Sequence, residues 1–342
     1  DTRQAKAAGP LHGARAPSGA AANTQWGRVG ASLSSDNEPM IAVYDLLAVG
    51  AAACGASSSL LAVTPVRHLG AFAFTRWRML LVASMLWVIV VATGSWHSLS
   101  LDAAGTLAAS GMAGIFIGDT ALFGAVQRLG PRRASVLFAT HAAFSAALGF
   151  VVLGERMGLQ AALGGALTMA GVMSAIVLGR HKEEQHAWES DHGSLRLGVT
   201  LGLVAAMGQA VSTLIAKPVM SAQAGALAVD PIAASAVRVS VACLAHYVLL
   251  WLGVGLARAH QPPTRRILLQ TALNGFVGMG LGMTFILMAL QKGDVGTVAI
   301  LSSVSPVLVL PLLWWQLGRA PAWGAWLGAG LTVAGTALIL LR

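Results

Sequence analysis

The chain contains an internal repeat, because residues 111–178 recur at 275–342 without a gap. A constant spacing of 164 residues joins Gly111 to Gly275, Gly114 to Gly278, Gly118 to Gly282, Gln127 to Gln291, Gly154 to Gly318 and Gly171 to Gly335. Both copies consist of long apolar runs. Repeats of this kind in a polytopic membrane protein are the usual plan of a secondary transporter, whose site lies between the halves. The repeat therefore constrains architecture and function together.

The composition places the chain in a membrane. Of its 342 residues, 56% are hydrophobic and only 10% are charged, whereas soluble domains carry about 25% charged residues. The apolar runs are too long for barrel strands, so they predict transmembrane helices. About ten spans are expected, near residues 42–63, 71–93, 104–126, 132–153, 158–179, 195–216, 232–256, 267–290, 295–317 and 322–341.

The spans divide into two sets of five. Residues 40–179 form the first predicted repeat and residues 195–342 the second, and the polar segment 180–194 links them. Residues 1–39 lack a long apolar run and are expected to be a disordered N-terminal tail. Because each half has an odd number of spans, the halves must face opposite ways. The predicted fold is therefore all-α and polytopic, with two inverted five-helix repeats.

The repeat also reaches the earlier spans. At a spacing of 153 residues, Gly55 pairs with Gly208 and Ser59 with Ser212, and Arg76 then falls near Arg238. This part of the alignment needs loops of different length in the two halves.

Several classes of function find no support. The net charge of +9 comes mostly from residues at helix ends and in loops, and no basic-aromatic module indicates nucleic acid. Cys54 and Cys243 lie inside apolar runs, so neither a disulfide framework nor a thiolate metal site is expected. No phosphate-binding P-loop is present. We expect no cofactor and no metal.

The ordered motifs resemble the EamA family of the drug/metabolite transporter superfamily. The resemblance is carried by residues 118–119, 125–127, 153–156 and 164–172 in the first half, and by residues 289–290, 305–307, 317–318 and 334–335 in the second. Arg76 at the start of the second span also fits the family pattern. The resemblance covers most of residues 41–341. It implies ten helices in two inverted five-helix repeats, and movement of small metabolites across the cell membrane by alternating access.

Two places depart from the family pattern. The first half has His141-Ala142 where the second has Ser305-Pro306, and the family usually has Ser-Pro. The second half has Arg319 where the first has Glu155, and the family usually has Leu-Gly-Glu.

Asp119 is the first candidate for the site. It lies within the third span, where a carboxylate costs about 2.5–3.5 kcal/mol to insert, so it should face the bundle interior or water. Its repeat partner is Met283, so it breaks the internal symmetry. Asp119 could accept a coupling proton or contact the substrate, or it could form a structural hydrogen bond between helices.

His141 is a second candidate because it lies inside the fourth span and could titrate near neutral pH. It could relay protons with Asp119 if their helices adjoin, and a structural hydrogen bond is the alternative.

Three further polar residues are candidates for a substrate pocket. Arg76 and Arg238 could each hold an anionic group, and Gln209 is the best of the uncharged polar residues inside the spans. Arg78 and Lys217, in contrast, are expected to extend their charges to the membrane interface.

The sequence therefore predicts a secondary active transporter, not an enzyme, that moves a small organic metabolite through the cell (inner) membrane. The family resemblance favours export. Membrane lipid, a coupling proton and a monomeric or homodimeric state complete the expectation. The alternatives are an intramembrane or lipid-modifying enzyme, and a channel-like protein. With both termini in the cytoplasm, 11 Lys and Arg residues would lie outside and 8 inside, against the positive-inside rule.

Overall fold

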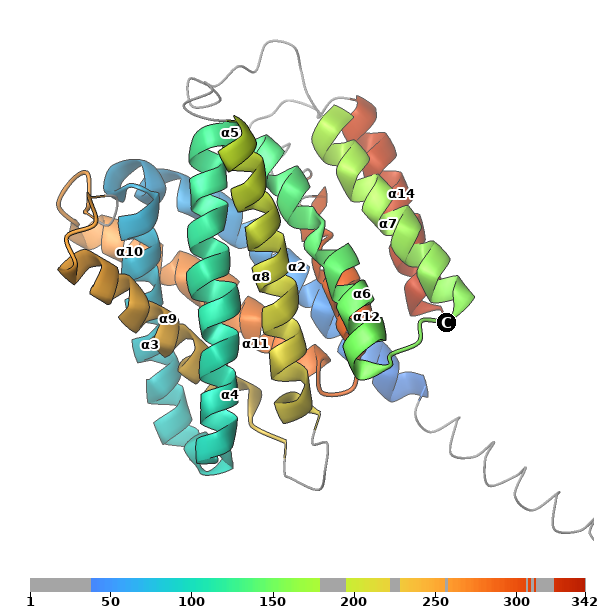
Figure 1. Cartoon of the computed structure of the whole chain (residues 1–342), viewed down its shortest axis with the longest axis horizontal. Helices are drawn as coiled ribbons and strands as arrows, with labels where there is room; N and C mark the ends of the chain where they lie inside the picture. Colours follow the sequence, from blue (N-terminus) through green and yellow to red (C-terminus); the bar gives the residue numbers. More distant parts are fainter. Residues whose placement is uncertain are drawn as a thin grey trace, which may run out of the picture. The chain divides into compact units, whose positions relative to one another are not determined.

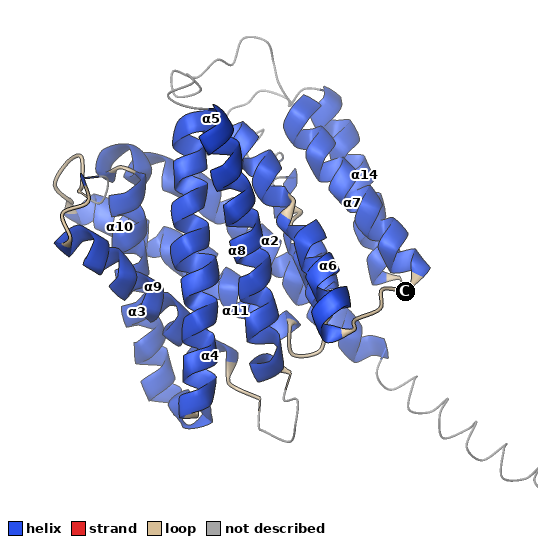
Figure 2. Cartoon of the chain, viewed as in Figure 1, coloured by secondary structure: helices blue, strands red, loops and turns tan. Residues whose placement is uncertain are grey.

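The computed structural model describes residues 38–178, 195–221, 228–255, 258–305, 307–308, 311 and 323–341. Regular structure in these residues is entirely helical (Figure 2). Helices are the expected outcome, because an α-helix satisfies its own backbone hydrogen bonds inside lipid. Residues 42–342 form one compact unit, and residues 1–41 are assigned to a separate unit. Most of the predicted tail and the whole of the predicted linker, 180–194, lie outside the described residues.

The first half follows the chain from α2 to α7 (Figure 1). Its helices are α2 (Glu38–Leu69), α3 (Ala71–Thr93), the short η1 (Ser95–Ser98), α4 (Leu101–Gly111), the π-helix η2 (Met112–Gly118), α5 (Asp119–Ala139), α6 (His141–Leu153) and α7 (Leu159–Leu178). The second half repeats this order. Its helices are α8 (Leu195–Met220), α9 (Pro231–Trp251), α10 (Arg265–Gly275), the π-helix η5 (Phe276–Leu281), α11 (Gly282–Ala289), α12 (Val295–Ser302) and α14 (Trp323–Leu340).

Eight helical segments among the described residues are long and apolar enough to cross a membrane, and Leu159–Ala175 is a shorter apolar helix. These nine correspond to nine of the ten predicted spans. The other predicted span, 295–317, is described mainly over α12, and most of its remainder lies outside the described residues. The number, length and apolar character of these helices therefore agree with the predicted multi-pass helical membrane protein.

The third and fourth spans separate where expected, since the apolar segments Leu101–Leu122 and Val136–Leu153 leave 127–131 between them, but the helix itself does not break there. Helix α5 runs through this segment, and the break comes at Thr140. Pro131 removes one backbone N–H donor, yet the helix continues past it. In the second half the chain does break at the matching place, between Ala289 and Val295.

The π-helices repeat at the spacing found in the sequence. Met112 begins η2 and Phe276 begins η5, which is 164 residues later. The preceding helices match as well, because Ser100 caps the N-terminus of α4 through its hydroxyl and Thr264 caps α10 in the same way. A π-helix inside an α-helix is uncommon and often marks a functional site. Its appearance at both equivalent places shows that the repeat is structural.

The close contacts of Gly118 and Gly282 also match. A Cβ added to Gly118 would lie 3.6 Å from the carbonyl oxygen of Ala205, and one added to Gly282 would lie 3.6 Å from that of Ala51. Ala51 and Ala205 are 154 residues apart. Burial agrees with this spacing, since each pair in the following set is buried in both halves: Ala48 and Gly202, Ala52 and Ala206, Ala56 and Ala210, Ser58 and Ser212. The predicted spacing of 153 residues is therefore wrong by one, and the structure gives 154.

The second helices align at a spacing of 160. Ala71 begins α3 and Pro231 begins α9. At this spacing buried residues pair with buried residues: Thr75 with Ser235, Met79 with Val239, Val82 with Ala242 and Ala83 with Cys243. Several of them form one apolar core between α3 and α9. The partner of Arg238 is therefore Arg78, and the predicted match with Arg76 is wrong.

Helices α7 and α14 lie side by side (Figure 1) and meet through glycines. The Cβ position of Gly164 faces the carbonyl oxygen of Gly335 at 2.8 Å, and that of Gly328 faces the carbonyl oxygen of Gly171 at 2.6 Å. Because the repeat exchanges Gly164 with Gly328 and Gly171 with Gly335, the contact is symmetric. The residue numbers rise along one helix as they fall along the other, so the two helices are antiparallel.

A leucine at Gly171 should separate these two helices. Its Cβ would overlap the backbone of Thr332, so we expect the free energy of unfolding to fall by about 1–3 kcal/mol, the usual cost of overpacking. Unfolding of the purified chain in detergent measures the loss. Gly330→Leu on α14 is the control, because nothing lies within 4 Å of its Cβ position. Equal losses in the two variants would contradict this packing.

Candidate functional site

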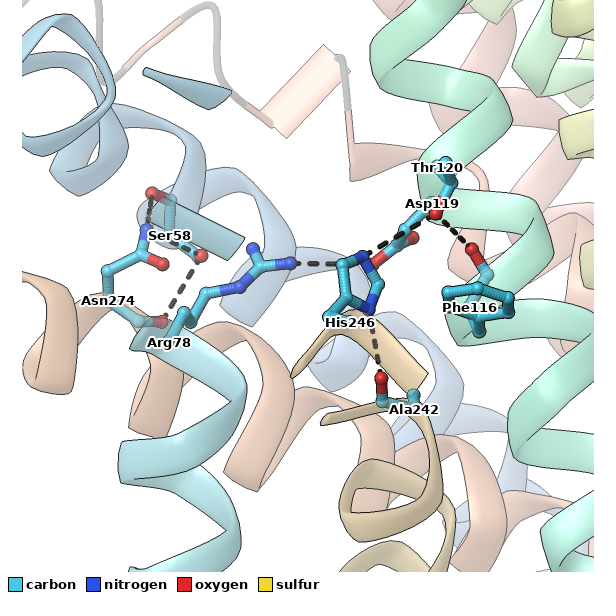
Figure 3. Close-up of polar contacts among 8 residues, drawn as sticks. All are labelled: Ser58, Arg78, Phe116, Asp119, Thr120, Ala242, His246 and Asn274. Carbon is cyan, nitrogen blue, oxygen red and sulfur yellow. Dashed lines mark hydrogen bonds and ion pairs between the residues drawn. The ribbon is translucent and has the colours of Figure 1, made fainter. Parts of the chain in front are cut away.

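Asp119 and Arg78 form an ion pair inside the helical bundle (Figure 3). The π-helix η2 ends at Gly118, so Asp119 is the first residue of α5, and Arg78 is the eighth residue of α3. Nη2 of Arg78 lies 3.4 Å from Oδ2 of Asp119, and the two side chains are 16% and 23% exposed. Arg78 was expected to extend to the membrane interface, and this is wrong because its guanidinium turns inward to the carboxylate.

A histidine of the second half stands beside this ion pair. His246 on α9 is buried, and its Nε2 lies 3.5 Å from Oγ1 of Thr120, the residue after Asp119. Its Nδ1 lies 2.9 Å from the carbonyl oxygen of Ala242 and donates to it, since a carbonyl only accepts. The ring of Phe116 in η2 packs edge-on against the imidazole. The segment around Asp119 therefore joins the first half to α9 of the second (Figure 3).

Arg238 lies in a polar cluster between α4, α8 and α9. It is 3% exposed, and its Nη2 donates to Oγ of Ser212 at 2.9 Å. The hydroxyl of Ser110 donates to the carbonyl oxygen of Ser212 at 2.7 Å, and that of Ser212 donates to the carbonyl oxygen of Ser110. The Cβ position of Gly111 lies 2.5 Å from the carbonyl oxygen of Arg238 and 2.9 Å from its Cα. The cluster thus places a guanidinium among neutral groups.

The symmetric place in the other half holds a neutral pair. Asn274 on α10, the repeat partner of Ser110, donates its amide to Oγ of Ser58 at 3.0 Å. Ser58 is in turn the partner of Ser212 at the spacing of 154. No arginine donates to Ser58 within the described part of the chain, because Arg78 extends to Asp119 instead (Figure 3). The two clusters share a scaffold and differ in charge.

Gln209 and Arg76 both lie close to these clusters. Gln209 on α8 is half-buried, and its Oε1 is 3.5 Å from the Cβ position of Gly114, beside Ser212. Arg76 is 6% exposed, and its guanidinium carbon lies 5.6 Å from the centre of the Tyr247 ring on α9. Asp119, Arg238, Gln209 and Arg76 thus occur where helices of the two halves meet.

His141 occupies a different environment. It begins α6, is 8% exposed, and its ring lies 5.1 Å from that of Phe138. Its Nδ1 has no hydrogen-bond partner among the described residues. No polar contact joins it to Asp119 in the described ranges, so a direct proton relay between the two finds no support. The histidine that lies close to Asp119 in space is His246, through its contact with Thr120.

Lys217 and Glu155 bind backbone groups of the second half near α12. Nζ of Lys217 donates to the carbonyl oxygens of Leu290 at 2.9 Å and Gly293 at 2.7 Å. The lysine is 7% exposed, so the expectation that it extends to the interface is wrong. Oε2 of Glu155 accepts the N–H of Val295, the first residue of α12, at 2.9 Å. Glu155 thereby caps a helix of the other half.

The Glu155 carboxyl lies at the edge of a hollow of about 400 Å³, lined by Ala146, Phe150, Glu155, Arg156, Met157 and Gly296. Burial raises the pKa of this carboxyl and Asp294 raises it further, while the N–H of Val295 opposes the rise. The hollow is lined by none of the predicted site residues. Arg319, the repeat partner of Glu155, lies outside the described residues.

The hydrogen bonds of Lys217 to the backbone of the second half predict that this lysine stabilises the fold. Lys217→Met should lower the free energy of unfolding by about 1–3 kcal/mol, because it leaves the carbonyl oxygens of Leu290 and Gly293 without their donor. Thermal unfolding in detergent provides the measurement. Lys292→Met, at an exposed position in the same region, should change stability by less than about 0.5 kcal/mol. If Lys217→Met leaves the free energy of unfolding unchanged, these two hydrogen bonds do not stabilise the fold.

Metal chemistry finds no support in the described residues, where no group of three or more His, Cys, Asp or Glu side chains is arranged to hold an ion. The histidines of the linker segment lie outside the described residues.

Comparison with known proteins gives the decisive observation. A family model described as the EamA-like transporter family matches residues 42–177 and again residues 196–341. The chain belongs to the EamA-like transporter family. The two matches coincide with the two structural halves, and the family is part of the drug/metabolite transporter superfamily. This EamA-like protein is thus a multi-pass membrane protein of a transporter family.

Solved structures share the fold of this EamA-like chain. One, titled "Crystal structure of protein", is similar with a TM-score of 0.69 and 16% sequence identity, over 87% of this chain and 96% of the other. Identity at this level supports the fold alone. No curated protein matches the sequence.

Proposed function

We propose that this EamA-like chain is a secondary active transporter that moves a small organic metabolite across the cell membrane by alternating access. The observation that carries the proposal is the Arg78–Asp119 ion pair, which lies inside a symmetric helical scaffold but has no symmetric copy. A charged pair among membrane helices is costly and usually functional. The site of a transporter built from repeats is expected where the halves meet.

The antiparallel contact of α7 with α14 supports inverted repeats. These helices are repeat partners, and a symmetry that makes partner helices antiparallel must reverse the direction of one half. We therefore infer ten spans in two inverted sets of five. The divisions expected from the sequence, 40–179 and 195–342 joined by a polar linker, fit this plan.

We assign roles to the candidate residues as follows. Asp119 contacts the substrate or accepts a coupling proton, and Arg78 holds the carboxylate in place. Gln209, Arg76 and Arg238 contribute to a binding surface where the halves meet, and His141 contributes from α6. We further propose export from the cell, with the chain acting as a monomer or homodimer.

Counterflow in lipid vesicles tests the proposal. The purified chain is reconstituted in vesicles loaded with an excess of one unlabelled metabolite, and entry of the same labelled metabolite is followed across a panel of organic acids, amino acids, sugars and nucleosides. A transporter should show faster entry when its substrate is present inside. Asp119→Asn should reduce this exchange at least about tenfold, the loss expected from about 1.4 kcal/mol.

Asp102→Asn is the matched control, because Asp102 is an exposed acid at the start of α4 in the same span. It should keep exchange near the level of the unaltered chain. Entry that does not respond to internal substrate would favour a channel, and chemical conversion of a metabolite would favour an enzyme. Either result would refute the proposed function.

A further inference from the structure

The internal symmetry maps the Arg78–Asp119 ion pair onto Arg238 and Met283. Arg78 and Arg238 are both the eighth residue of their helices, at the spacing of 160 that also matches burial along α3 and α9. Asp119 and Met283 are partners at the spacing of 164 that matches η2 with η5. One half thus has an arginine and a carboxylate, whereas the other has an arginine and a thioether.

Position 283 lies beside the helix that carries Arg238. Met283 is partly buried and packs against the core that contains Val239, the residue after Arg238. The next residue, Thr284, bonds to Ser235 on α9, with 3.1 Å between the two hydroxyl oxygens. These contacts place α11 against α9 at the level of Arg238. A carboxylate at position 283 would therefore be on a helix adjacent to Arg238.

Arg238 carries a charge that the protein does not neutralise among the described residues. Its side chain is 3% exposed, its Nη2 donates a hydrogen bond to the neutral hydroxyl of Ser212, and its Nε has no hydrogen-bond partner among those residues. No Asp or Glu in the described ranges lies within 4 Å of its guanidinium. A buried cation without an anion is strongly unfavourable. An anionic ligand would remove this cost and would gain a charge-assisted hydrogen bond.

We propose that Arg238 binds a carboxylate of the transported substrate, at the place where the symmetry of the fold would put a second aspartate. The substrate is thus an organic acid or amino acid. This inference rests on the proposed function. The guanidinium suits the planar carboxylate because it can donate two parallel N–H bonds. Closure of the halves around the substrate completes a second ion pair that matches Arg78–Asp119.

Binding of matched acids and amides to the purified full chain tests the inference without requiring transport. The probes are glutamate and glutamine, aspartate and asparagine, succinate and succinamide, and benzoate and benzamide, with inorganic phosphate as a separate arm. Ligands that bind the folded state raise its unfolding temperature. At least one acid should stabilise the chain at millimolar concentration, and its amide should bind at least about tenfold more weakly.

Two substitutions make the test specific. Arg238→Gln should weaken binding of the acid at least about tenfold and leave the weak binding of the amide unchanged. Met283→Asp should also weaken binding of the acid, because the new carboxylate pairs with the Arg238 guanidinium. The same pairing should raise the unfolding temperature of the chain without ligand. The asparagine of Met283→Asn has nearly the same shape as aspartate but no charge. This variant should therefore bind the acid about tenfold more tightly than Met283→Asp does. The Met283 variants keep the test valid even if Arg238→Gln does not fold.

The inference is overturned if acids and amides bind alike, if only phosphate or only uncharged probes bind, if no acid binds at millimolar concentration, or if Met283→Asp binds acids as tightly as the unaltered chain. Its failure is distinguishable from failure of the proposed function. Binding of acids through Arg238 without counterflow would refute transport alone, whereas counterflow of a neutral metabolite without binding of acids would refute this inference alone.

Discussion

Replacing Asp119 by leucine should destabilise the folded chain by about 3 kcal/mol, because it leaves the Arg78 guanidinium inside the bundle without its carboxylate. We expect the lower end of the range for buried pairs because the side chains keep 16% and 23% of their exposure. The double variant Arg78→Met with Asp119→Leu should recover most of the loss, since it buries no unpaired charge. Unfolding in detergent is measured for the unaltered chain, the single variants Asp119→Leu and Arg78→Met, and the double variant. The four free energies of unfolding give the coupling free energy between Arg78 and Asp119.

Stability and transport should separate in this set. The double variant should fold nearly as well as the unaltered chain, yet it should have lost exchange in vesicles, because both charges of the proposed site are gone. If the two single losses simply add in the double variant, the ion pair does not act as a unit. If the double variant transports normally, the pair is structural and the site lies elsewhere.

The second large effect concerns orientation. Leu101 begins α4 and Arg265 begins α10, and they are repeat partners at a spacing of 164. Both are exposed, Leu101 by 90%. If the repeats are inverted, single cysteines at these two positions should react with a membrane-impermeant maleimide from opposite faces. The background is Cys54→Ala with Cys243→Ala, which removes the natural thiols.

Neighbouring positions provide the controls for this experiment. Trp96→Cys should react from the same face as Leu101→Cys, and Arg258→Cys from the same face as Arg265→Cys, since each pair shares one end of its helices. Labelling of Leu101→Cys and Arg265→Cys from one common face would exclude an inverted arrangement. The same data decide which end is cytoplasmic, where the count of basic residues and the family resemblance conflict.

The fold could be predicted from the sequence to a large extent. Hydropathy locates apolar helices because insertion into lipid depends on composition over about 20 residues, whatever their neighbours. The repeat spacing of 164 holds in the structure down to the first residue of each π-helix. The π-helices themselves were not predicted, because an apolar Gly-rich segment such as residues 112–118 is equally compatible with an α-helix.

The partners of the site residues were harder to predict. A helix that is apolar on all sides carries little information about which side faces protein, so rotation about its axis cannot be read from hydropathy. Arg78 could reach either the interface or Asp119, and general experience with arginine favoured the interface. Arg76 fitted the family pattern, yet burial along α3 identifies Arg78 as the partner of Arg238. The pattern of buried and exposed residues along α3 and α9 depends on which helices they contact. Those contacts are known only from the structure.

A transporter of this kind must open the region where its two halves meet to each side of the membrane in turn. Gln209 lies there, beside Gly114 and Gly118, so a single cysteine at Gln209 in the cysteine-free background reports access to it. Labelling with an impermeant maleimide is measured from each face of oriented vesicles, with and without substrate. We expect Gln209→Cys to react from either face, and we expect saturating substrate to slow both reactions. Reaction from one face alone under every condition, or from neither, would contradict alternating access.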